Sequence, residues 1–420
     1  MFWLEIYKFL GNCFSYLFKG YFNIRGGPDY FDSLRLGSIE DIPKSRMWVH
    51  AVSVGELKAV EPFIEELKKR KYRVLLTTGT RSGFDLGKVI YKDDSDVFVT
   101  VMPFDFSKNV KSFFSKAKPQ AVFFVETELW PVCISECKKR KLPLFWLNGR
   151  ISDRAFKAKG LYYKALSWMI GQFDLCFMKS LEDLRKASTI SKSSVYKKIK
   201  GVCLGDLKYD KIPKIKRLKR SVLKIKNEKI IVLGSSHYGE EDLVCDAYRV
   251  LKNKFKNLKL VIAPRKIERK EYLRNLFSDF KTVSWSEGQD FNWEKIDILL
   301  IDEIGLLSNL YSIGDVALVG GSWVKRGGHN PIEPSFFGVP TIFGPSMDNF
   351  REVAQYLVNS GGAMSASSNE LVDVIENLLK DKSKRKEVGL FASEAVKSRK
   401  GVSKRLFNEI EKLIQQGPKV

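Results

Sequence analysis

Short apolar runs separated by amphipathic stretches constrain the fold of this chain more than any other feature. The runs are rich in Val, Ile, Leu and Phe, which is typical of strands buried on both faces of a sheet. In the first half of the chain they cover residues 47–52, 73–78, 97–102, 120–125, 143–148, 174–178 and 199–204. The first interval carries Leu57, Val60 and Ile64 at helical spacing. This alternation predicts βαβ units and a parallel sheet.

The same rhythm restarts in the second half. Its apolar runs cover residues 229–234, 258–263, 297–301, 315–319 and 339–343. A Pro-containing, Lys-rich segment at 211–228 precedes them and is interpreted as a solvated basic linker, with a lipid-facing basic surface as the alternative. The sequence therefore predicts two Rossmann-like α/β domains facing a cleft, at 27–210 and 229–390, an arrangement typical of the GT-B glycosyltransferase fold. Helical sequence continues over about 385–415, and the final segment, 391–420, is expected to form a C-terminal helix that could cross back to the first domain.

The N-terminal segment 1–26 is crowded with aromatic residues, but Glu5, Lys8 and Lys19 interrupt it. A spanning helix needs about 20 nearly uninterrupted apolar residues. We therefore expect an amphipathic anchor helix at a membrane interface, with Lys19 and Arg25 at the headgroups. The alternative is a soluble helix docked on the protein's own surface. The Gly-, Pro- and Asp-rich residues 27–45 are expected to form a loop.

The net charge of +23 in 420 residues favours polyanionic partners such as nucleic acid, anionic lipid or a phosphorylated substrate. A general enrichment in Lys would explain the charge equally well. The three histidines are too scattered in sequence to indicate a zinc site or a histidine-dependent triad. The chain also lacks a P-loop motif and an Asp-x-Asp clamp at a strand exit, so neither a bound metal ion nor a cofactor is expected.

Carboxylates follow two of the apolar runs in the first half. Glu56 ends the small turn Val52-Ser53-Val54-Gly55-Glu56, and Glu126 and Glu128 follow the run at 120–125. Ligands of open α/β sheets bind at the carboxyl ends of strands. Glu56 is thus a candidate base, and Glu126, nearest its strand end, is favoured over Glu128. A glutamate in a first helical turn can instead simply stabilise the helix dipole, and solvated turns would also explain the pair at 126 and 128.

Four turns in the second half of the chain also follow apolar runs and carry groups that could bind a ligand. Gly234-Ser235-Ser236-His237 could present N–H groups to an anion. Arg265 follows Pro264 at the next strand exit, and Gly305, Leu306 and Leu307 offer amides at another. The strongest motif is 327–334, Gly-Gly-His-Asn-Pro-Ile-Glu-Pro, in which Glu333 could accept two ribose hydroxyls.

These motifs, taken in order, resemble those of the 3-deoxy-D-manno-octulosonic acid (Kdo) transferases, which build the inner core of lipopolysaccharide. The resemblance extends from the N-terminal helix to about residue 400. It is carried by the segments 52–56, 126–131, 148–154, 205–210, 234–241, 264–269, 320–334 and 344–350. One position departs from the family pattern, because Lys266 stands where the family usually has His after Pro-Arg.

The resemblance implies a GT-B fold and an inverting, metal-independent transfer of Kdo from CMP-Kdo to a phosphorylated lipid A precursor (lipid IVA) at the cytoplasmic face of the bacterial inner membrane. It implies Glu56 as general base, with Glu126 and Lys208 stabilising the transition state. The residues that it places at the CMP site are Pro264, Arg265, Gly305, Leu306, Leu307, Asn330, Pro331, Ile332 and Glu333. Anionic membrane is an expected partner and nucleic acid is not.

Two other functions remain open from the residues alone. One is another two-domain nucleotide-sugar enzyme, such as a UDP-sugar transferase or epimerase. The other is a basic nucleic-acid-binding protein, which would need a basic stripe with interleaved aromatic residues on one face. Here the aromatic residues fall mainly in the apolar runs and the N-terminal helix.

Overall fold

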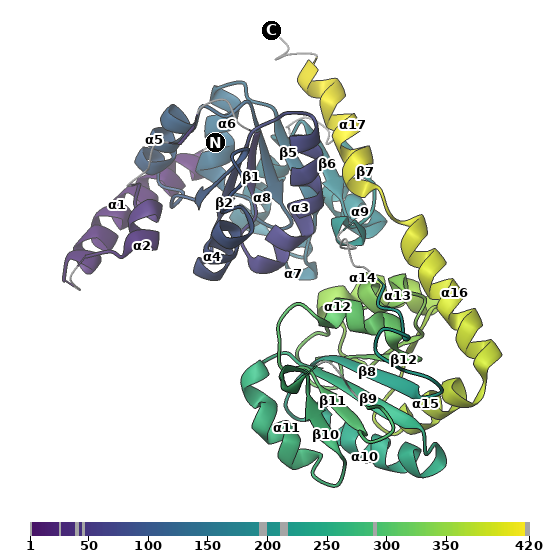
Figure 1. Cartoon of the computed structure of the whole chain (residues 1–420). Helices are drawn as coiled ribbons and strands as arrows, with labels where there is room; N and C mark the ends of the chain where they lie inside the picture. The colour runs from purple at the N-terminus through teal and green to yellow at the C-terminus, as the bar shows by residue number, and fades with distance from the viewer. Residues whose placement is uncertain are drawn as a thin grey trace. The chain divides into compact units, whose positions relative to one another are not determined.

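The computed structural model describes residues 2–24, 27–37, 42–43, 47–192, 200–210, 217–288 and 292–415 (Figure 1). The chain divides into two compact units. The first unit comprises residues 1–211 and 401–420, and the second comprises residues 212–400. Each unit is built on its own parallel sheet.

The sheet of the first unit has the strand order β3-β2-β1-β4-β5-β6-β7. Every neighbouring pair in it is parallel. The strands are β1 (Met47–His50), β2 (Val74–Thr78), β3 (Val97–Val101), β4 (Ala121–Val125), β5 (Leu144–Gly149), β6 (Leu175–Met178) and β7 (Gly201–Cys203). The connecting helices are α3 (Val54–Lys69), α4 (Arg81–Ile90), α5 (Ser107–Ala117), α6 (Pro131–Lys139), α7 (Asp153–Phe156), α8 (Gly160–Gly171) and α9 (Leu181–Lys192). The α/β architecture expected from the apolar runs is confirmed.

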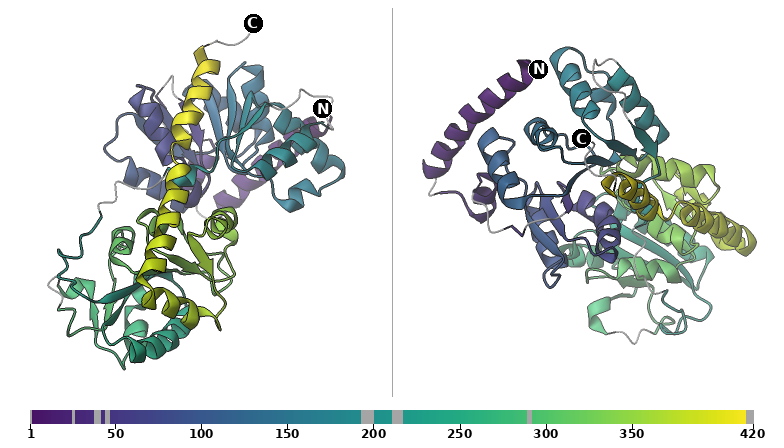
Figure 2. Two further views of the ribbon diagram at one scale, coloured as in Figure 1. Left: turned by 90° about the vertical axis from the view of Figure 1, so that its right-hand side faces the viewer. Right: turned by 90° about the horizontal axis from the view of Figure 1, so that it is seen from above.

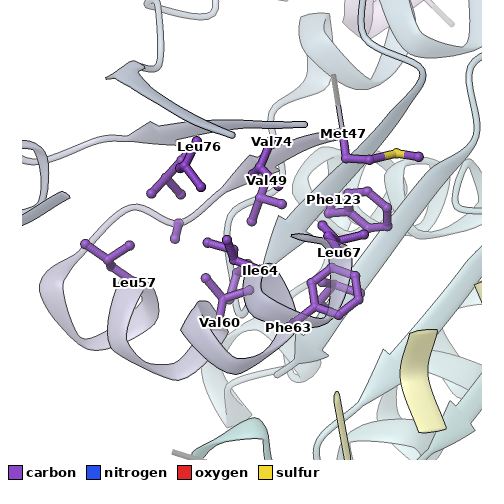
Figure 3. Close-up of a cluster of buried hydrophobic side chains, with 14 of the residues drawn as sticks. Met47, Val49, Leu57, Val60, Phe63, Ile64, Leu67, Val74, Leu76 and Phe123 are labelled. Atoms are coloured by element: carbon purple, nitrogen blue, oxygen red, sulfur yellow. The ribbon is translucent and has the colours of Figure 1, made fainter. Parts of the chain in front are cut away.

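Helix α3 covers one face of this sheet with the apolar stripe that its sequence predicts. Leu57, Val60 and Ile64 are fully buried, and they pack with strand residues such as Val49 and Phe123 (Figure 3). Burying a side chain of this size stabilises the fold by about 1.5–3 kcal/mol relative to leaving it exposed. The same core cluster contains residues of the last helix, α17 (Val402–Gln415), which lies beside α3 (Figure 1).

Asp210 holds the beginning of α17. Its Oδ1 accepts hydrogen bonds from the backbone N–H groups of Gly401 at 2.6 Å and Val402 at 3.2 Å, and its Oδ2 accepts one from Ser403 at 2.5 Å. The first N–H groups of a helix have no partner inside it. The carboxylate of Asp210, although distant in sequence, therefore caps this helix. We expected one helix at about 385–415. The structure instead has α16 (Lys382–Ser398) and α17, separated at Gly401, whose φ of +81° favours glycine.

The other face of the first sheet is covered by α5, α6, α8 and α9 together with the beginning of α1 (Phe2–Ile24), the purple helix in Figure 2. Leu4 is fully buried there, and the ring of Trp3 meets that of Trp168 edge to face at 5.4 Å. Elsewhere on its surface α1 exposes Ile6, Phe9, Leu10 and Phe14. Helix α1 is therefore docked on its own unit while presenting apolar side chains to solvent. Among the described residues no helix is long and apolar enough to cross a membrane.

The expectation of a loop over residues 27–45 was wrong in part. Residues Tyr30–Arg35 form a short helix, α2. The side chain of Asp29 accepts a hydrogen bond from the N–H of Asp32 and caps it, and Phe31 and Leu34 are buried in the core. A capping aspartate and two core contacts outweigh the turn-forming composition around them.

The sheet of the second unit has the strand order β10-β11-β9-β8-β12-β13-β14. Its strands are β8 (Lys229–Ser236), β9 (Leu258–Pro264), β10 (Thr282–Ser284), β11 (Ile298–Leu300), β12 (Val316–Val319), β13 (Thr341–Phe343) and β14 (Ala363–Ser365). Its helices, besides α16, are α10 (Glu240–Lys254), α11 (Lys270–Leu276), α12 (Leu307–Leu310), α13 (Ile332–Phe336), α14 (Arg351–Asn359) and α15 (Leu371–Lys380). The two strands that we did not expect, β10 and β14, are its short edge strands.

The basic segment before β8 is not simply a solvated linker. Residues 211–216 lie outside the described residues, but the segment from 217 onward packs against the second unit. Leu223 and Ile225 are buried in its core, and Arg220 pairs with Asp315 at 2.5 Å. The segment departs from a solvated linker because apolar residues alternate with its cations. These apolar residues are buried in the core of the second unit.

Candidate functional site

Glu56 lies at the point where the sequence predicts a ligand-binding turn. The backbone leaves β1, and Ser53 caps α3 by accepting a hydrogen bond from the N–H of Glu56 at 3.4 Å. The carboxylate of Glu56 folds back, and its Oε2 accepts a hydrogen bond from the N–H of Val52 at 2.7 Å. This reciprocal arrangement closely resembles a capping box. It fixes the carboxylate at the carboxyl edge of β1 and occupies Oε2.

The environment of Glu56 changes its acidity. Its side chain is 9% exposed, and this burial raises the pKa of Glu56 to about 8. The N–H of Val52 opposes the rise in pKa, whereas the neighbouring carboxylates of Glu126 and Glu128 add to it. A carboxyl group whose pKa lies near the working pH is suited to general acid–base catalysis. Glu56 therefore combines a fixed place at the carboxyl edge of β1 with an acidity suited to proton transfer near neutral pH.

Glu126 leaves the end of β4 in a left-handed conformation, with φ of +56°. Its N–H donates to Leu147 O at 2.9 Å, and its carbonyl oxygen accepts from Trp146 Nε1 at 2.5 Å. A non-glycine residue in this conformation is strained and is often found at functional sites. Hydrogen bonds to the neighbouring strand β5 thus hold the backbone of Glu126 in this conformation.

Lys208 places a cation close to the carboxylate of Glu126, with Nζ 3.9 Å from Oε1. Asn148 supports this pair. Its Nδ2 lies 3.5 Å from Glu126 Oε1 and donates to Asp206 Oδ1 at 3.2 Å, and its Oδ1 accepts from the N–H of Leu207 at 3.1 Å. The ends of β4, β5 and β7 are in this way connected, and the three predicted catalytic residues Glu56, Glu126 and Lys208 come together at one sheet edge.

The glycine-rich turns of the second unit also meet at the carboxyl edge of their sheet. A Cβ on Gly320 would overlap the carbonyl oxygen of Ser235, so only glycine lets the two turns approach this closely. The fully buried Glu240 joins them, since its Oε1 accepts from the N–H groups of His237 at 2.8 Å and Gly321 at 2.6 Å. The backbone of this edge is therefore fixed by packing and by hydrogen bonds to one buried carboxylate.

Glu333 is positioned by two partners at the same edge. Asn330 Nδ2 donates to its Oε1 at 3.1 Å, and Ser308 Oγ donates to its Oε2 at 2.7 Å. Ser308 follows the turn of Gly305, Leu306 and Leu307 directly, so two of the predicted nucleotide-binding segments are adjacent. Asn330 also accepts the N–H of Ile332 at 3.0 Å, which orders the beginning of α13.

The segment of Pro264 and Arg265 reaches the same edge. Pro264 is in register with Ser236 across the β8–β9 pair, and the N–H of Arg265 donates to Ser236 O at 3.0 Å. The side chain of Arg265 is exposed. The predicted residues of the second half thus gather where the strands β8, β9, β11 and β12 end.

Comparison with known proteins connects both edges to one family. A sequence profile described as 3-Deoxy-D-manno-octulosonic-acid transferase (kdotransferase) matches residues 33–211. A 3-deoxy-D-manno-octulosonic acid transferase from Aquifex aeolicus is 32% identical over 338 residues, which cover 80% of this chain and 86% of the relative. The chain belongs to the Kdo transferase family.

Two further relatives are similar to most of this chain. A 3-deoxy-D-manno-octulosonic acid transferase from Haemophilus influenzae is 29% identical, covering 89% of this chain and 88% of the relative. A bifunctional glycosyltransferase/methyltransferase from Fusobacterium nucleatum is also 29% identical, over 83% of this chain, but the chain spans 55% of that longer protein. The protein is thus a glycosyltransferase, as the resemblance of the motifs implied.

Solved structures agree on the fold of this Kdo transferase family member. A glycosyltransferase from Rickettsia africae matches with a TM-score of 0.60 and 14% identity, over 89% of this chain and 99% of that one. A UDP-GlcNAc 2-epimerase from Neisseria meningitidis bound to UDP-GlcNAc matches with a TM-score of 0.59 and 13% identity, over 88% and 100%. At such low identity these likenesses show the GT-B type of fold alone.

Sequence reasoning missed several residues that the Kdo transferase fold brings to these edges. Ser308 and Glu240 hold the predicted residues in place, and Asp206 does so in the first unit. The most unexpected pair is His237 and His329, which are 92 residues apart in sequence and whose Nε2 atoms lie 2.8 Å apart. The turn at 234–237 after a strand was a usable signal for His237, but nothing in the spacing indicated its partner.

Proposed function

We propose that this enzyme transfers Kdo from CMP-Kdo to a phosphorylated lipid A precursor, lipid IVA, with inversion at the anomeric carbon and without a metal ion. Family membership supports the donor and the class of acceptor. The observation that carries the chemical assignment is the buried carboxylate of Glu56, which is fixed by Val52 and whose pKa is raised to about 8.

The proposed reaction needs one base and a good leaving group. Glu56 takes the proton from the acceptor hydroxyl as its oxygen attacks the anomeric carbon of Kdo. The bond between that carbon and the phosphate oxygen breaks, and its electron pair leaves with CMP. Because a phosphate already leaves readily, cationic and amide stabilisation matter more than a strong acid. No step requires a metal ion or an organic cofactor.

In the proposed mechanism Glu126 and Lys208 act next to the reacting atoms. The 3.9 Å separation of Lys208 Nζ from Glu126 Oε1 keeps the cation beside the strand edge. Charge that develops on the sugar or the leaving group is then met by fixed charges rather than by reorganising water. The support from Asn148 and Asp206 holds this geometry before the substrate binds.

In the second unit, the residues proposed for CMP divide into three groups. Glu333, positioned by Asn330 and Ser308, accepts the ribose hydroxyls, and the turn of Gly305, Leu306 and Leu307 offers its backbone groups to the nucleoside. Pro264 and Arg265 bring a cation toward the phosphate. Pro331 and Ile332 shape the beginning of α13 beside the same ligand.

We further propose that the enzyme works at the cytoplasmic face of a bacterial inner membrane. Helix α1 is docked by Leu4 and exposes Phe9, Leu10 and Phe14, each about half or more exposed. An apolar helix face of this kind inserts into the headgroup boundary, and the net charge of +23 favours anionic lipid. Removal of residues 1–24 is expected to reduce binding to anionic vesicles, and undiminished vesicle binding would place the anchor elsewhere.

The decisive experiment supplies purified protein with CMP-Kdo, generated in situ, and a tetraacyl lipid A precursor, and weighs the products by mass spectrometry. A product heavier by one or more Kdo units is expected. UDP-sugars offered in place of CMP-Kdo are the control for another nucleotide-sugar enzyme. The absence of product despite CMP binding would contradict the proposed acceptor or sugar, and the absence of CMP binding would contradict the donor.

A further inference from the structure

His237 and His329 form a hydrogen-bonded pair at the carboxyl edge of the second sheet. Their Nε2 atoms lie 2.8 Å apart, and their rings are nearly coplanar, with an interplanar angle of 2° and centroids 5.1 Å apart. At this distance one Nε2 must carry the shared hydrogen and donate it to the other. Two neutral imidazoles use one proton for this bond, and both rings remain only half-buried.

Backbone contacts fix both histidines. The N–H of His237 donates to Glu240 Oε1 at 2.8 Å, and the N–H of His329 donates to Gly320 O at 3.1 Å. The ring of His329 also lies against Gly321, where an added Cβ would come within 3.0 Å of its Cδ2. The short separation of the two Nε2 atoms is therefore set by two rigid turns rather than by flexible side chains.

The pair is surrounded by cations. Burial is the largest cause that lowers the pKa of His237. Four cations lower it further: Arg326, Arg265, Arg269 and Lys266. Burial, His237 and Arg265 lower the pKa of His329 to about 4. The nearby carboxylates are already engaged, since Glu240 accepts backbone N–H groups and Glu241 binds Arg269 and Ser236. Without a ligand this edge carries excess positive charge that opposes protonation of either ring.

We propose that the histidine pair and its surrounding cations form the binding site for the phosphate of the nucleotide, and that the pair takes up one proton when a phosphate monoester occupies the site. This inference rests on the proposed function for the identity of the nucleotide. The proton comes from solvent and binds Nδ1 of the ring whose Nε2 donates, so the resulting imidazolium keeps the Nε2–H···Nε2 hydrogen bond. No bond to carbon or phosphorus is made or broken by the pair.

The physical reason is the change of charge during the reaction. CMP-Kdo is a phosphodiester with one negative charge on its phosphate, whereas the released CMP is a monoester with a charge of about −1.5 to −2 at neutral pH. The additional charge offsets the repulsion from Arg265, Lys266 and Arg326, and an anion close to an imidazole favours its protonated form. The site therefore adds a positive charge in step with the negative charge that the leaving group acquires.

The test follows the histidine resonances of the full-length protein by NMR during pH titrations. The chain has three histidines, and the third, His50, is fully buried in the first unit and serves as the internal control. Titrations are recorded without ligand, with saturating CMP, with cytidine and with inorganic phosphate. We expect CMP to raise the titration midpoint of one histidine of the pair by about one pH unit or more, whereas cytidine leaves it unchanged.

The ligand arms separate this inference from the proposed function. If the cytosine resonances show that CMP binds while both midpoints stay where they were, the inference is wrong and the donor assignment stands. If CMP does not bind but inorganic phosphate raises a midpoint, the donor assignment fails and the anion site stands. If neither CMP nor phosphate moves a midpoint, the inference is overturned.

Two variants add a test that does not depend on assigning resonances. His329→Gln removes the partner of His237, and we expect proton uptake on CMP binding, measured by calorimetry in buffers of different ionisation enthalpy, to disappear. Lys382→Gln removes an exposed cation of α16 that is not among the cations of the proposed site, so it should retain the uptake. Equal proton uptake by both variants would contradict a role for the pair.

Discussion

The carboxylate of Glu56 accepts a hydrogen bond from the backbone N–H of Val52, four residues earlier, at 2.7 Å. This hydrogen bond fixes the side chain of the candidate base against the backbone at the carboxyl end of β1. It uses Oε2 and lowers the pKa of Glu56, against the larger effect of burial, which raises it. A carboxyl group held in this way can be tested through its chemistry, its pH dependence and its effect on stability.

Replacement of Glu56 by Gln should reduce kcat by about 10²–10⁴-fold, the usual contribution of a positioned general base. The amide oxygen of Gln can still accept the Val52 N–H, so the turn should survive. CMP affinity should not change, because the residues proposed for CMP lie in the other unit. Transfer assays and CMP titration check this, with Glu65→Gln on the same helix as the control. Normal turnover by the Glu56→Gln enzyme would exclude Glu56 as the base.

The rate of transfer should rise with pH. Since burial raises the pKa of Glu56 to about 8, the base is mostly protonated at neutral pH, and kcat/KM should increase up to about pH 8 and then level off. Glu128→Gln removes a carboxylate that raises the pKa of Glu56, so its profile should move to lower pH. A profile that is flat between about pH 6 and 9, or unmoved in the variant, would speak against Glu56 as the titrating group.

The same carboxyl group should make the free energy of unfolding depend on pH. Its pKa is higher in the folded protein than in the unfolded chain, so its stabilising contribution is complete below its unfolded pKa and is lost as pH rises through about 8. Gln cannot ionise, so Glu56→Gln should be more stable than wild type at about pH 8–9 by on the order of 3 kcal/mol, and little different at about pH 4. Urea unfolding at both pH values measures this, and equal differences at both would refute the assignment.

Asp210 should contribute measurably to the attachment of the last helix. Replacement by Ala leaves the N–H groups of Gly401, Val402 and Ser403 without their carboxylate, and we expect a loss of about 0.5–2 kcal/mol, as for other helix caps. Limited proteolysis should then cut before α17 more rapidly. Glu409→Ala, on an exposed face of the same helix, is the matched control. Unchanged cleavage of the Asp210 variant would mean that core packing alone retains α17.

Gly320→Ala should abolish nucleotide binding by the second unit. Its new methyl group would overlap the carbonyl oxygen of Ser235, so the two turns at this edge would have to separate. Gly288→Ala tests backbone strain alone, because that glycine has φ of +132° but its Cβ would meet nothing within 4 Å. For Gly288→Ala we expect at most a loss of folding stability. Its CMP affinity, measured by calorimetry, should be normal. If folded Gly320→Ala still binds CMP, nucleotide binding does not require the close approach of the two turns.

The strands in the middle of both sheets were predictable because they are buried on both faces and read as continuous apolar runs. The edge strands β10 and β14, Thr282–Ser284 and Ala363–Ser365, were not, since they are three residues long and carry polar side chains. The helix α2 was missed for the opposite reason. Its turn-forming neighbours dominate the local composition, whereas its stability comes from Phe31 and Leu34 in a core that the local sequence does not reveal.

The residues of the candidate site also differ in how far they could be predicted from local sequence. Glu56, Glu126 and Glu333 were recognisable because each follows a strand or a glycine-rich turn within a few residues. The partners that position them were not, because Asn148 meets Asp206 from 58 residues away and Ser308 meets Glu333 from 25 residues away. The histidine pair joins turns 92 residues apart, so its existence depends on the order of strands β8 and β12 in the folded sheet.

The return of α17 to the first unit has a consequence for the order in which the protein is made. The nascent chain presents Leu57, Val60 and their neighbours long before the ribosome has translated Leu406 and Phe407, which share their core cluster. Gly401 follows Asp210 by 191 residues, and at about 5–20 residues per second that separation takes roughly 10–40 s. Throughout that interval an apolar strip beside α3 lacks its cover, so the newborn first unit exposes apolar surface of the kind that chaperones protect.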